Sequence, residues 1–348
     1  MVEIVSSQAP RGDAPLVWDP SDIETWATWA RAQPDPLWII QDWVPGDSQM
    51  IISGQAKSAY KTWFAMALAI AAASGKELFG FKPTNPAGVP VTFIELEGAI
   101  KPTEERFRML LNAGGLTYAD IKQNFRFSHR ESIKVDSPLW VEQISANITY
   151  RNTKLVVVDT LARAHRGDEN SARDIATVVD AFDTWNHLDA RPTVMFLHHI
   201  RKRSGGASRD TDSIDDDLRG SSALGGMYSS HIGIRHRTGS DQKFLDIETS
   251  FKDGQNRKYV GSWTIDQPNC TASLRVDPVD GQNGPPAYVV AEQLSAMVPG
   301  AAYPVRQLSK LWSMGGKETT TLADQLVSAG KLSRADNGSV AWKLSEGQ

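Results

Sequence analysis

A short apolar run that leads into a small-residue loop and an apolar helix constrains the fold of this chain most. The run Met50–Ser53 has the length of a strand, Gly54–Tyr60 forms the loop, and Lys61-Thr62 opens the apolar segment Trp63–Ala73. Backbone N–H groups of such a loop, with the positive N-terminus of the following helix, can surround a phosphate group. The stretch therefore predicts a strand, a phosphate loop and a helix in that order.

The residues of this loop suggest individual roles. In the pattern G-x-x-x-x-G-K-[ST], the lysine reaches the β- and γ-phosphates of a nucleotide and the hydroxyl holds Mg²⁺, which would be Lys61 and Thr62 here. The fit is incomplete, because Gln55 and Tyr60 occupy the two glycine positions and Gly54 lies one place early. By itself the stretch also suits an ordinary strand–turn–helix unit. The expected nucleotide-binding residues are Gly54, Gln55, Ala56, Lys57, Ser58, Ala59, Tyr60, Lys61 and Thr62.

Length and composition set the broad class. A chain of 348 residues has room for one domain of about 250 residues and a smaller one. Its one cysteine, Cys270, excludes a disulfide framework and favours a reducing, cytoplasmic compartment. No apolar run approaches the roughly 20 residues of a membrane helix, so no membrane partner is expected. Because the net charge is −4, contact with nucleic acid must come from a local basic patch.

Between Gln49 and about Val276, apolar runs of strand length alternate with helical patterns. This alternation predicts right-handed β-α-β crossovers and a mainly parallel sheet with helices on both faces. The expected strands are 50–53, 89–94, 125–128, 155–158 and 193–197, and the expected helices are 62–73, 103–113, 139–150 and 171–187. After Gly225, shorter strands at 231–237, 243–251 and 262–265 suggest an antiparallel extension of the same sheet.

The flanking segments complete the expected domain organisation. Residues 1–16 are predicted to be a flexible tail, and residues 17–276 an α/β core that begins with a Trp-rich helical lead-in. Trp38–Trp43 is expected to pack on the edge of the core, with nucleobase stacking as the alternative. The composition of residues 277–288 predicts a linker. Residues 289–348 contain three helix-length segments and then Asp336-Asn337-Gly338, a strong hairpin signal, which together predict a winged helix-turn-helix domain.

Carboxylates follow two of the expected strands. Asp159 ends the apolar run Leu155–Val158, and ligands of a doubly wound sheet bind outside the carboxyl ends of its strands. Asp159 would therefore face the same crevice as Lys61 and hold Mg²⁺ directly or through water; an exposed Asp that starts a turn is the alternative. Glu95 and Glu97 end another strand. Glu97 lies beyond the apolar run, so we expect it, rather than Glu95, to activate water beside a γ-phosphate.

Histidines and basic residues follow the strand at 193–197. Adjacent strand residues point to opposite faces, so one of His198 and His199 is expected to sense the γ-phosphate and the other to be buried; two structural histidines are the alternative. The next segment is basic and contains serine and glycine, which suits the phosphate backbone of single-stranded DNA. It could equally be a solvated loop. Its expected DNA-binding residues are Arg201, Lys202, Arg203 and Arg209.

Taken together, these motifs resemble the RecA-like core of the RepA-type hexameric ATPases, relatives of the DnaB-type replicative helicases. The resemblance covers roughly Trp38–Trp263 and rests on Val156–Leu161, His198-His199 and Asp217–Ala223. It implies a RecA-like P-loop NTPase fold and a homo-oligomeric, hexameric ring that hydrolyses ATP with Mg²⁺ on single-stranded DNA. It also implies that Glu97 is the catalytic glutamate and that His199 couples the γ-phosphate to a DNA-binding loop at 205–217.

One departure from the family concerns the residue that reaches the neighbouring subunit's nucleotide. Where the family has Lys-x-Arg, this chain has Ser250–Gly254, and Lys252 lacks the bidentate fork of arginine. Lys252, Arg219 or Arg257 is therefore expected in that role. Two other functions stay open: an ATPase that loads or assists other proteins without unwinding DNA, and a DNA-binding regulator that binds duplex DNA or a protein through the C-terminal domain.

Overall fold

The computed structural model describes most of the chain between residues 22 and 278 and parts of the C-terminal segment. The described residues are 22–32, 38–55, 59–129, 132–168, 171–200, 228–236, 244–252, 256–278, 294, 297–298, 301–312, 316–328, 332–334 and 341–344. The chain divides into two compact units, Met1–Leu37 and Trp38–Gln348. The predicted tail at 1–16 lies outside the described residues.

Helix α1 (Ile23–Ala32) is the described helix of the first unit. Asp22 caps its N-terminus, because the Asp22 carboxylate accepts the backbone N–H groups of Glu24 and Thr25, both at 3.0 Å. Ile23 and Trp26 on this helix are exposed.

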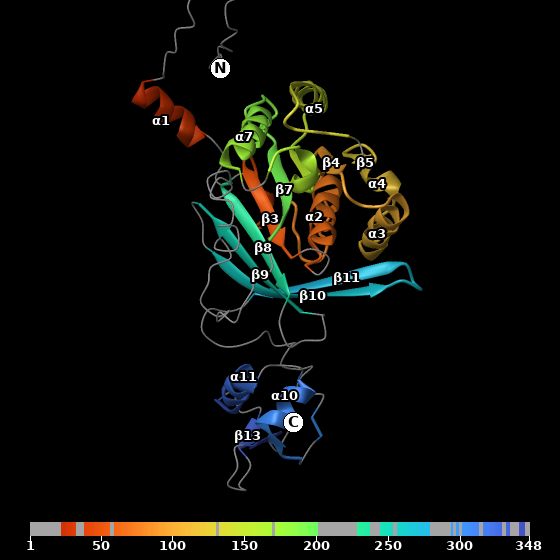
Figure 1. The fold of residues 1–348 in the computed structure, drawn as a ribbon, viewed down its shortest axis with the longest axis vertical. Coiled ribbons are helices and arrows are strands. Elements are labelled where there is room, and N and C mark those ends of the chain that lie inside the picture. Colours follow the sequence, from red (N-terminus) through yellow and green to blue (C-terminus); the bar gives the residue numbers. More distant parts are fainter. Residues whose placement is uncertain are drawn as a thin grey trace, which may run out of the picture. The chain divides into compact units, whose positions relative to one another are not determined.

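The second unit is built on a nine-stranded sheet in the order β11-β10-β9-β8-β3-β7-β6-β4-β5 (Figure 1). Strands β8, β3, β7, β6, β4 and β5 pair in parallel, and β9, β10 and β11 continue the sheet antiparallel. The strands are β3 (Gln49–Gly54), β4 (Val91–Glu95), β5 (Phe125–His129), β6 (Leu155–Asp159), β7 (Thr193–His199), β8 (Ser230–His236), β9 (Phe244–Phe251), β10 (Arg257–Asp266) and β11 (Thr271–Pro278). The predicted parallel sheet and its antiparallel extension are therefore both present, and together they form one mixed sheet.

Helices cover both faces of the parallel strands. The helices are α2 (Lys61–Ser74), α3 (Ile100–Ala113), α4 (Tyr118–Ile121), α5 (Pro138–Arg151), α6 (Leu161–Ala164) and α7 (Ala172–Asn186). Met50 and Ile52 of β3 pack in the same cluster as α2 and α3, whereas Ile51 packs with α5 and α7. Because successive side chains of a strand point to opposite faces, β3 is buried on both sides, which explains its continuous apolar sequence.

The strand β3 ends at a glycine for a steric reason. A Cβ on Gly54 would lie 2.6 Å from the carbonyl oxygen of Ile234 on β8 and 2.7 Å from Cβ of Ala59. Neither gap admits a side chain, so the close approach of β8 and of the loop end requires glycine at this position.

The antiparallel extension contains one strand that the sequence reading omitted. Strands β8, β9 and β10 lie close to the predicted ranges, although β10 begins at Arg257 rather than 262, and β11 follows them. The prediction that the antiparallel part begins with the first of these strands is wrong, because β8 pairs in parallel with β3 and the direction changes only at β9. Along β11, Ala272 and Leu274 are buried while Ser273 and Arg275 are exposed. This period of two is the ordinary mark of a half-covered strand.

The segment Trp38–Pro45 forms the small antiparallel pair β1 (Trp38–Ile40) and β2 (Val44–Pro45). Trp43 is buried, and its ring centroid lies 5.5 Å from that of Phe64, 5.2 Å from Phe81 and 4.6 Å from Tyr259. The predicted packing on the core is therefore found for Trp43.

The described C-terminal residues form a small sheet and two helices. The sheet has the order β12-β14-β13, with β12 (Tyr303–Pro304), β13 (Leu332–Arg334) and β14 (Ala341–Leu344), and the helices are α10 (Val305–Leu311) and α11 (Gly316–Ser328). Leu308, Trp312, Leu322 and Leu326 belong to one buried cluster. Two of the three predicted helices are present as α10 and α11, and β13 and β14 form the predicted hairpin pair. Most of the remaining predicted helix, at 289–297, lies outside the described residues.

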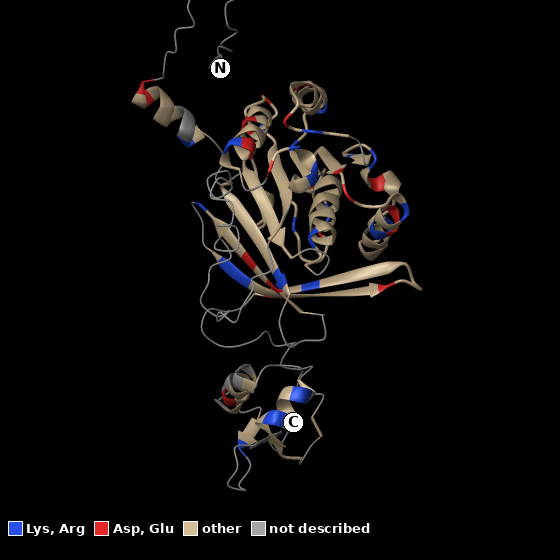
Figure 2. Cartoon of the chain, viewed as in Figure 1, with Lys and Arg blue, Asp and Glu red and all other residues tan. Residues whose placement is uncertain are grey.

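The charged residues lie mainly outside the central strands of the nine-stranded sheet. Figure 2 shows Lys, Arg, Asp and Glu mainly on helices and on the antiparallel strands, and β3 and β7 carry none of them. Among the helices that the structure describes, none has the length and apolar character that crossing a membrane requires.

Candidate functional site

The end of the phosphate loop presents a buried lysine. Lys61 is the first residue of α2 and is 5% exposed. Its Nζ donates to the carbonyl oxygens of Gly54, at 2.8 Å, and Gln55, at 3.0 Å. Burial lowers the pKa of Lys61 to about 8, against the opposing effect of the charges on Asp159 and Glu97. A desolvated ammonium held by neutral carbonyls is well placed to exchange them for a phosphate. Ala56, Lys57 and Ser58 lie outside the described residues.

Tyr60 takes the backbone conformation that the loop pattern normally assigns to glycine. It precedes α2 with φ 52° and ψ 25°, in the left-handed region. Its carbonyl accepts the first helical hydrogen bond, from Phe64 N–H at 3.0 Å, and its ring stacks on Trp263 at a centroid distance of 6.4 Å. The missing glycine therefore does not change the course of the chain into α2.

Asp159 lies beside this lysine at the end of β6. It is 2% exposed and pairs in register with Glu95 of β4. Burial, and then the neighbouring Glu95 charge, raise the pKa of Asp159, while a hydrogen bond from the Thr62 side chain opposes the increase. Because β6 and β4 pair in parallel, Glu95 and Asp159 lie side by side at the edge of the sheet where Lys61 lies.

The donor set at Thr62 and Asp159 fits Mg²⁺. The Oδ2 atom of Asp159 is buried and has no hydrogen-bond partner, and the hydroxyl of Thr62 bonds to the same carboxylate. Oxygen donors are the ligands that Mg²⁺ prefers, and it keeps several waters or phosphate oxygens besides one or two protein ligands. Within the described ranges no three His, Cys, Asp or Glu side chains gather as a metal cage, so phosphate and water would supply the remaining ligands.

Glu95 and Glu97 have different surroundings. Glu95 is 1% exposed, and its Oε1 accepts the backbone N–H groups of Glu97, at 2.9 Å, and Gly98, at 2.7 Å. The Glu97 side chain is 47% exposed. Its Oε2 lies 3.4 Å from Nε2 of His199 and 3.5 Å from Oγ1 of Thr160. Glu95 is thus held by backbone, whereas Glu97 reaches solvent beside polar partners.

The two histidines of β7 also separate. His199 pairs in register with Gly54 and contacts Glu97, and it is only partly buried. His198 is buried, and burial lowers its pKa to about 4, so its imidazole is neutral near pH 7. Behind it, Ser53 Oγ and His231 Nε2 share a buried hydrogen bond of 2.7 Å. The parallel strand ends therefore bring together Lys61, Thr62, Asp159, Glu97 and His199.

Arg106 is a neighbour of this group that the sequence reading missed. Its guanidinium carbon lies 5.4 Å from the ring centroid of Trp63, the residue after Thr62. Burial lowers the pKa of Arg106, and the charges of Glu95 and Asp159 oppose that shift. Helix α3 also carries Lys101 and Arg108, so the sequence offers no sign of which basic residue faces inward.

The residues predicted to reach a neighbouring subunit's nucleotide lie in different surroundings. Lys252 is exposed directly after β9, whose last residue Phe251 pairs with Ser230 and thus lies level with Met50. That is the end of β3 opposite Gly54, so Lys252 stands away from its own phosphate loop. Arg257 forms an ion pair of 2.8 Å with Asp42 of its own chain. Arg219 and the predicted DNA-binding residues Arg201, Lys202, Arg203 and Arg209 lie outside the described residues.

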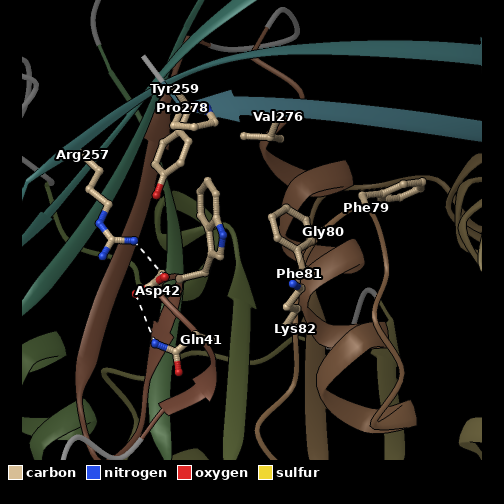
Figure 3. A pocket seen from close by; sticks show the side chains of 11 residues that line it. Gln41, Asp42, Phe79, Gly80, Phe81, Lys82, Arg257, Tyr259, Val276 and Pro278 are labelled. Carbon is tan, nitrogen blue, oxygen red and sulfur yellow. Dashed lines mark hydrogen bonds and ion pairs between the residues drawn. The ribbon is translucent and has the colours of Figure 1, made fainter. Parts of the chain in front are cut away.

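A pocket of about 450 Å³ lies apart from the phosphate-loop edge, although Arg257 lines it (Figure 3). Trp43, Phe79, Phe81 and Tyr259 supply aromatic walls, and the Arg257–Asp42 pair borders it. None of the residues at the phosphate-loop edge lines this pocket. It is therefore a separate feature.

Comparison with known proteins identifies the family of the chain. The family model described as an AAA domain matches residues 19–205, which is more than half of the 348 residues. The chain belongs to this AAA domain family. The matched segment contains Lys61, Glu97, Asp159 and His199.

A second comparison concerns the fold. The fold is similar to a solved structure described as an ATPase domain, with a TM-score of 0.53 and 13% identity over 73% of this chain and 99% of that chain. At this identity the match shows the fold alone, a RecA-like α/β core. A comparison with curated proteins finds no match.

Proposed function

We propose that this protein is a Mg²⁺-dependent ATPase whose site lies at the carboxyl ends of β3, β6, β4 and β7. The observation that carries the proposal is the convergence of three charged side chains: Lys61 at the start of the helix after β3, Asp159 at the end of β6 and Glu97 just after β4. A P-loop ATPase needs a cation for phosphate, oxygens for Mg²⁺ and a carboxylate for water in one crevice. Membership of the AAA domain family supports this assignment.

Each side chain has a role that follows from its surroundings. Lys61 exchanges its carbonyl partners for the β- and γ-phosphates, Gly54–Tyr60 surrounds them, and Thr62 and Asp159 hold Mg²⁺. Bound Mg²⁺ neutralises charge on the phosphates. Glu97 is the general base, because its partly exposed carboxylate can reach a water molecule, and His199 at 3.4 Å senses whether the γ-phosphate is present.

We further propose that the protein is a ring-forming, RepA-type motor on single-stranded DNA. The exposed Lys252, at the end of the sheet away from its own loop, supports a site completed by a neighbouring subunit; Arg219 is the other residue for this role. The segment Arg201–Arg209 directly follows β7, so DNA contact there would act on His199. An ATPase that assists other proteins without unwinding is the alternative. The C-terminal helices and hairpin would serve as a winged-helix domain for duplex DNA or a protein partner.

The test is ATP hydrolysis by the purified protein with and without single-stranded DNA. The proposal predicts Mg²⁺-dependent hydrolysis that single-stranded DNA stimulates, together with a change in oligomer size when ATP is added. Hydrolysis without stimulation would favour the assisting ATPase, and a strand-displacement assay separates the two. No hydrolysis under any of these conditions would refute the enzymatic function.

A further inference from the structure

The left-handed backbone of Tyr60 is unfavourable for a residue that has a side chain. With φ 52° and ψ 25°, its Cβ lies close to the following carbonyl group, a cost that glycine does not have. Such a conformation persists only where the surrounding structure enforces it, and conformations of this kind gather at functional sites. Tyr60 stands directly before Lys61, so a tyrosine here requires a compensating contact.

Trp263 of β10 supplies this contact. It is 6% exposed, and the Tyr60 ring stacks on it with an interplanar angle of 26° and a centroid distance of 6.4 Å. Two further rings pack on the same indole: Trp63 of α2, at 5.5 Å, and Phe79, at 5.6 Å. Ring pairs of this kind stabilise a structure beyond the area that they bury. Trp263 therefore joins the antiparallel part of the sheet to the end of the phosphate loop.

The two ends of the phosphate loop meet beside Tyr60. From a Cβ placed on Gly54, Cβ of Ala59 would be 2.7 Å away and Cγ of Lys61 3.4 Å away. Lys61 Nζ also donates to the Gly54 carbonyl at 2.8 Å. Ala59 and Lys61 are the chain neighbours of Tyr60. A Tyr60 ring that is fixed on Trp263 therefore fixes the base of the loop and the start of the Lys61 side chain.

We propose that Tyr60 and Trp263 are positioning residues that hold the phosphate loop ready for the nucleotide. The stacked ring restricts the end of the loop before phosphate arrives, which a glycine in the same place does not do. A site whose conformation is already restricted loses less entropy when its ligand binds. This inference rests on the proposed ATPase function and assigns neither ring a contact with the nucleotide. Loss of the stacking should therefore weaken ATP binding more than it lowers kcat.

The experiment replaces Tyr60 with glycine, the residue of the loop pattern at this position, and measures equilibrium binding of a fluorescent ATP analogue. Tyr60→Gly should weaken binding by about 3- to 10-fold, the size of a lost aromatic pair, with kcat at saturating ATP within about threefold of wild type. Tyr60→Phe keeps the ring and should bind the analogue as wild type does. Trp263→Leu should weaken binding, and the double variant should bind no more weakly than the weaker single variant, because both changes remove the same pair.

Phe79→Gly is the matched control. Phe79 is also a non-glycine residue in the left-handed region, with φ 56°, and its ring also packs on Trp263. It lies outside the phosphate loop, in a turn closed by two backbone hydrogen bonds between Leu78 and Phe81, of 2.9 and 3.2 Å. Phe79→Gly should therefore leave binding of the analogue unchanged, whatever it does to the temperature of unfolding.

Circular dichroism and thermal unfolding establish that each variant is folded. If Tyr60→Gly is not, Tyr60→Leu, which removes the ring and keeps an apolar side chain, replaces it with the same expected result. Weaker binding in the Tyr60 variant together with unchanged binding in Phe79→Gly supports the inference.

Binding by Tyr60→Gly that is as tight as in wild type, or tighter, would overturn the inference, because glycine would then only relieve strain. Equal weakening in Phe79→Gly, or losses that multiply in the double variant, would overturn it as well. Wild-type protein whose binding of the analogue does not depend on Lys61 would instead overturn the proposed function itself.

Discussion

The parallel and antiparallel parts of the core sheet differ in what their residues do. All six residues of β3 and all five of β6 are buried, and the polar groups of the proposed site lie at or beyond their last residues. Along β9 and β11, by contrast, buried residues alternate with more exposed ones. Strands β3 and β6 therefore have no side-chain position free for function except at their ends.

The comparison indicates where substitutions should affect activity and where they should affect stability. Helices on both faces of the parallel part force its chemistry to one edge, where four strand ends bring polar residues together. The antiparallel part can vary its less buried face without disturbing that edge. Substitutions at the edge of the parallel part should therefore change turnover, and core substitutions in the antiparallel part should change the free energy of unfolding.

The largest effect is expected for Lys61→Ala. The γ-phosphate would lose the buried ammonium that faces the loop, and loss of one preorganised charge contact typically lowers turnover by about 10²- to 10³-fold or more. Steady-state ATP hydrolysis measures it. Lys76→Ala is the control, because this lysine lies just after α2 and is 59% exposed in a surface pair with Asp120. Equal activity in wild type and Lys61→Ala would remove the phosphate-loop assignment.

Glu97→Gln should lower turnover by about 10²-fold, the scale of a lost general base, with ATP binding nearly intact. The amide keeps the size of the side chain but cannot accept the proton from water. Turnover and equilibrium binding of a fluorescent ATP analogue distinguish the two steps. If Glu95→Gln shows this behaviour and Glu97→Gln does not, the roles of the two carboxylates are reversed.

In the antiparallel part, Leu245→Ala should lower the free energy of unfolding by about 2–5 kcal/mol while kcat changes little. Leu245 on β9 is fully buried in the core cluster, so truncation leaves a cavity. Urea unfolding gives the free energy, and Glu248→Ala on the less buried face of the same strand should stay within about 0.5 kcal/mol of wild type. A selective loss of kcat in folded Leu245→Ala would mean that the two parts are not separable.

The smallest effect concerns Arg201, Lys202 and Arg203. Replacing all three with Ala should weaken single-stranded DNA binding and flatten its salt dependence by roughly 0.7 in the log–log slope for each lost phosphate contact. Binding titrations at several salt concentrations measure the slope. An unchanged slope would indicate that this segment is a solvated loop.

Much of the fold follows from the sequence because β-α-β alternation is a strong and local signal. The predicted strand at 155–158 is β6 with one further residue, Asp159, and the helix expected at 62–73 is α2 extended by a residue at each end. The antiparallel strands were predicted less completely than the parallel ones. The alternating residues Ala272 and Leu274 of β11 carry a period of two, but they are the only buried residues among the eight of this strand.

The site was predictable where it depends on strand ends and not where it depends on packing. Lys61, Asp159, Glu97 and His199 each follow an apolar run, and a parallel sheet brings such positions together. The contact between Ser53 and His231 joins residues 178 positions apart. The burial of Arg106 depends on how α3 packs on Trp63. No local pattern encodes either feature.

The most direct test of the central claim is a structure of the protein with Mg²⁺ and a non-hydrolysable ATP analogue. We expect the γ-phosphate to contact Lys61 Nζ, the metal ion to contact Thr62 and to lie beside Asp159, and a water molecule to lie between the γ-phosphate and Glu97. A nucleotide bound elsewhere, for example in the pocket lined by Trp43 and Tyr259, with the phosphate-loop edge empty, would contradict the account.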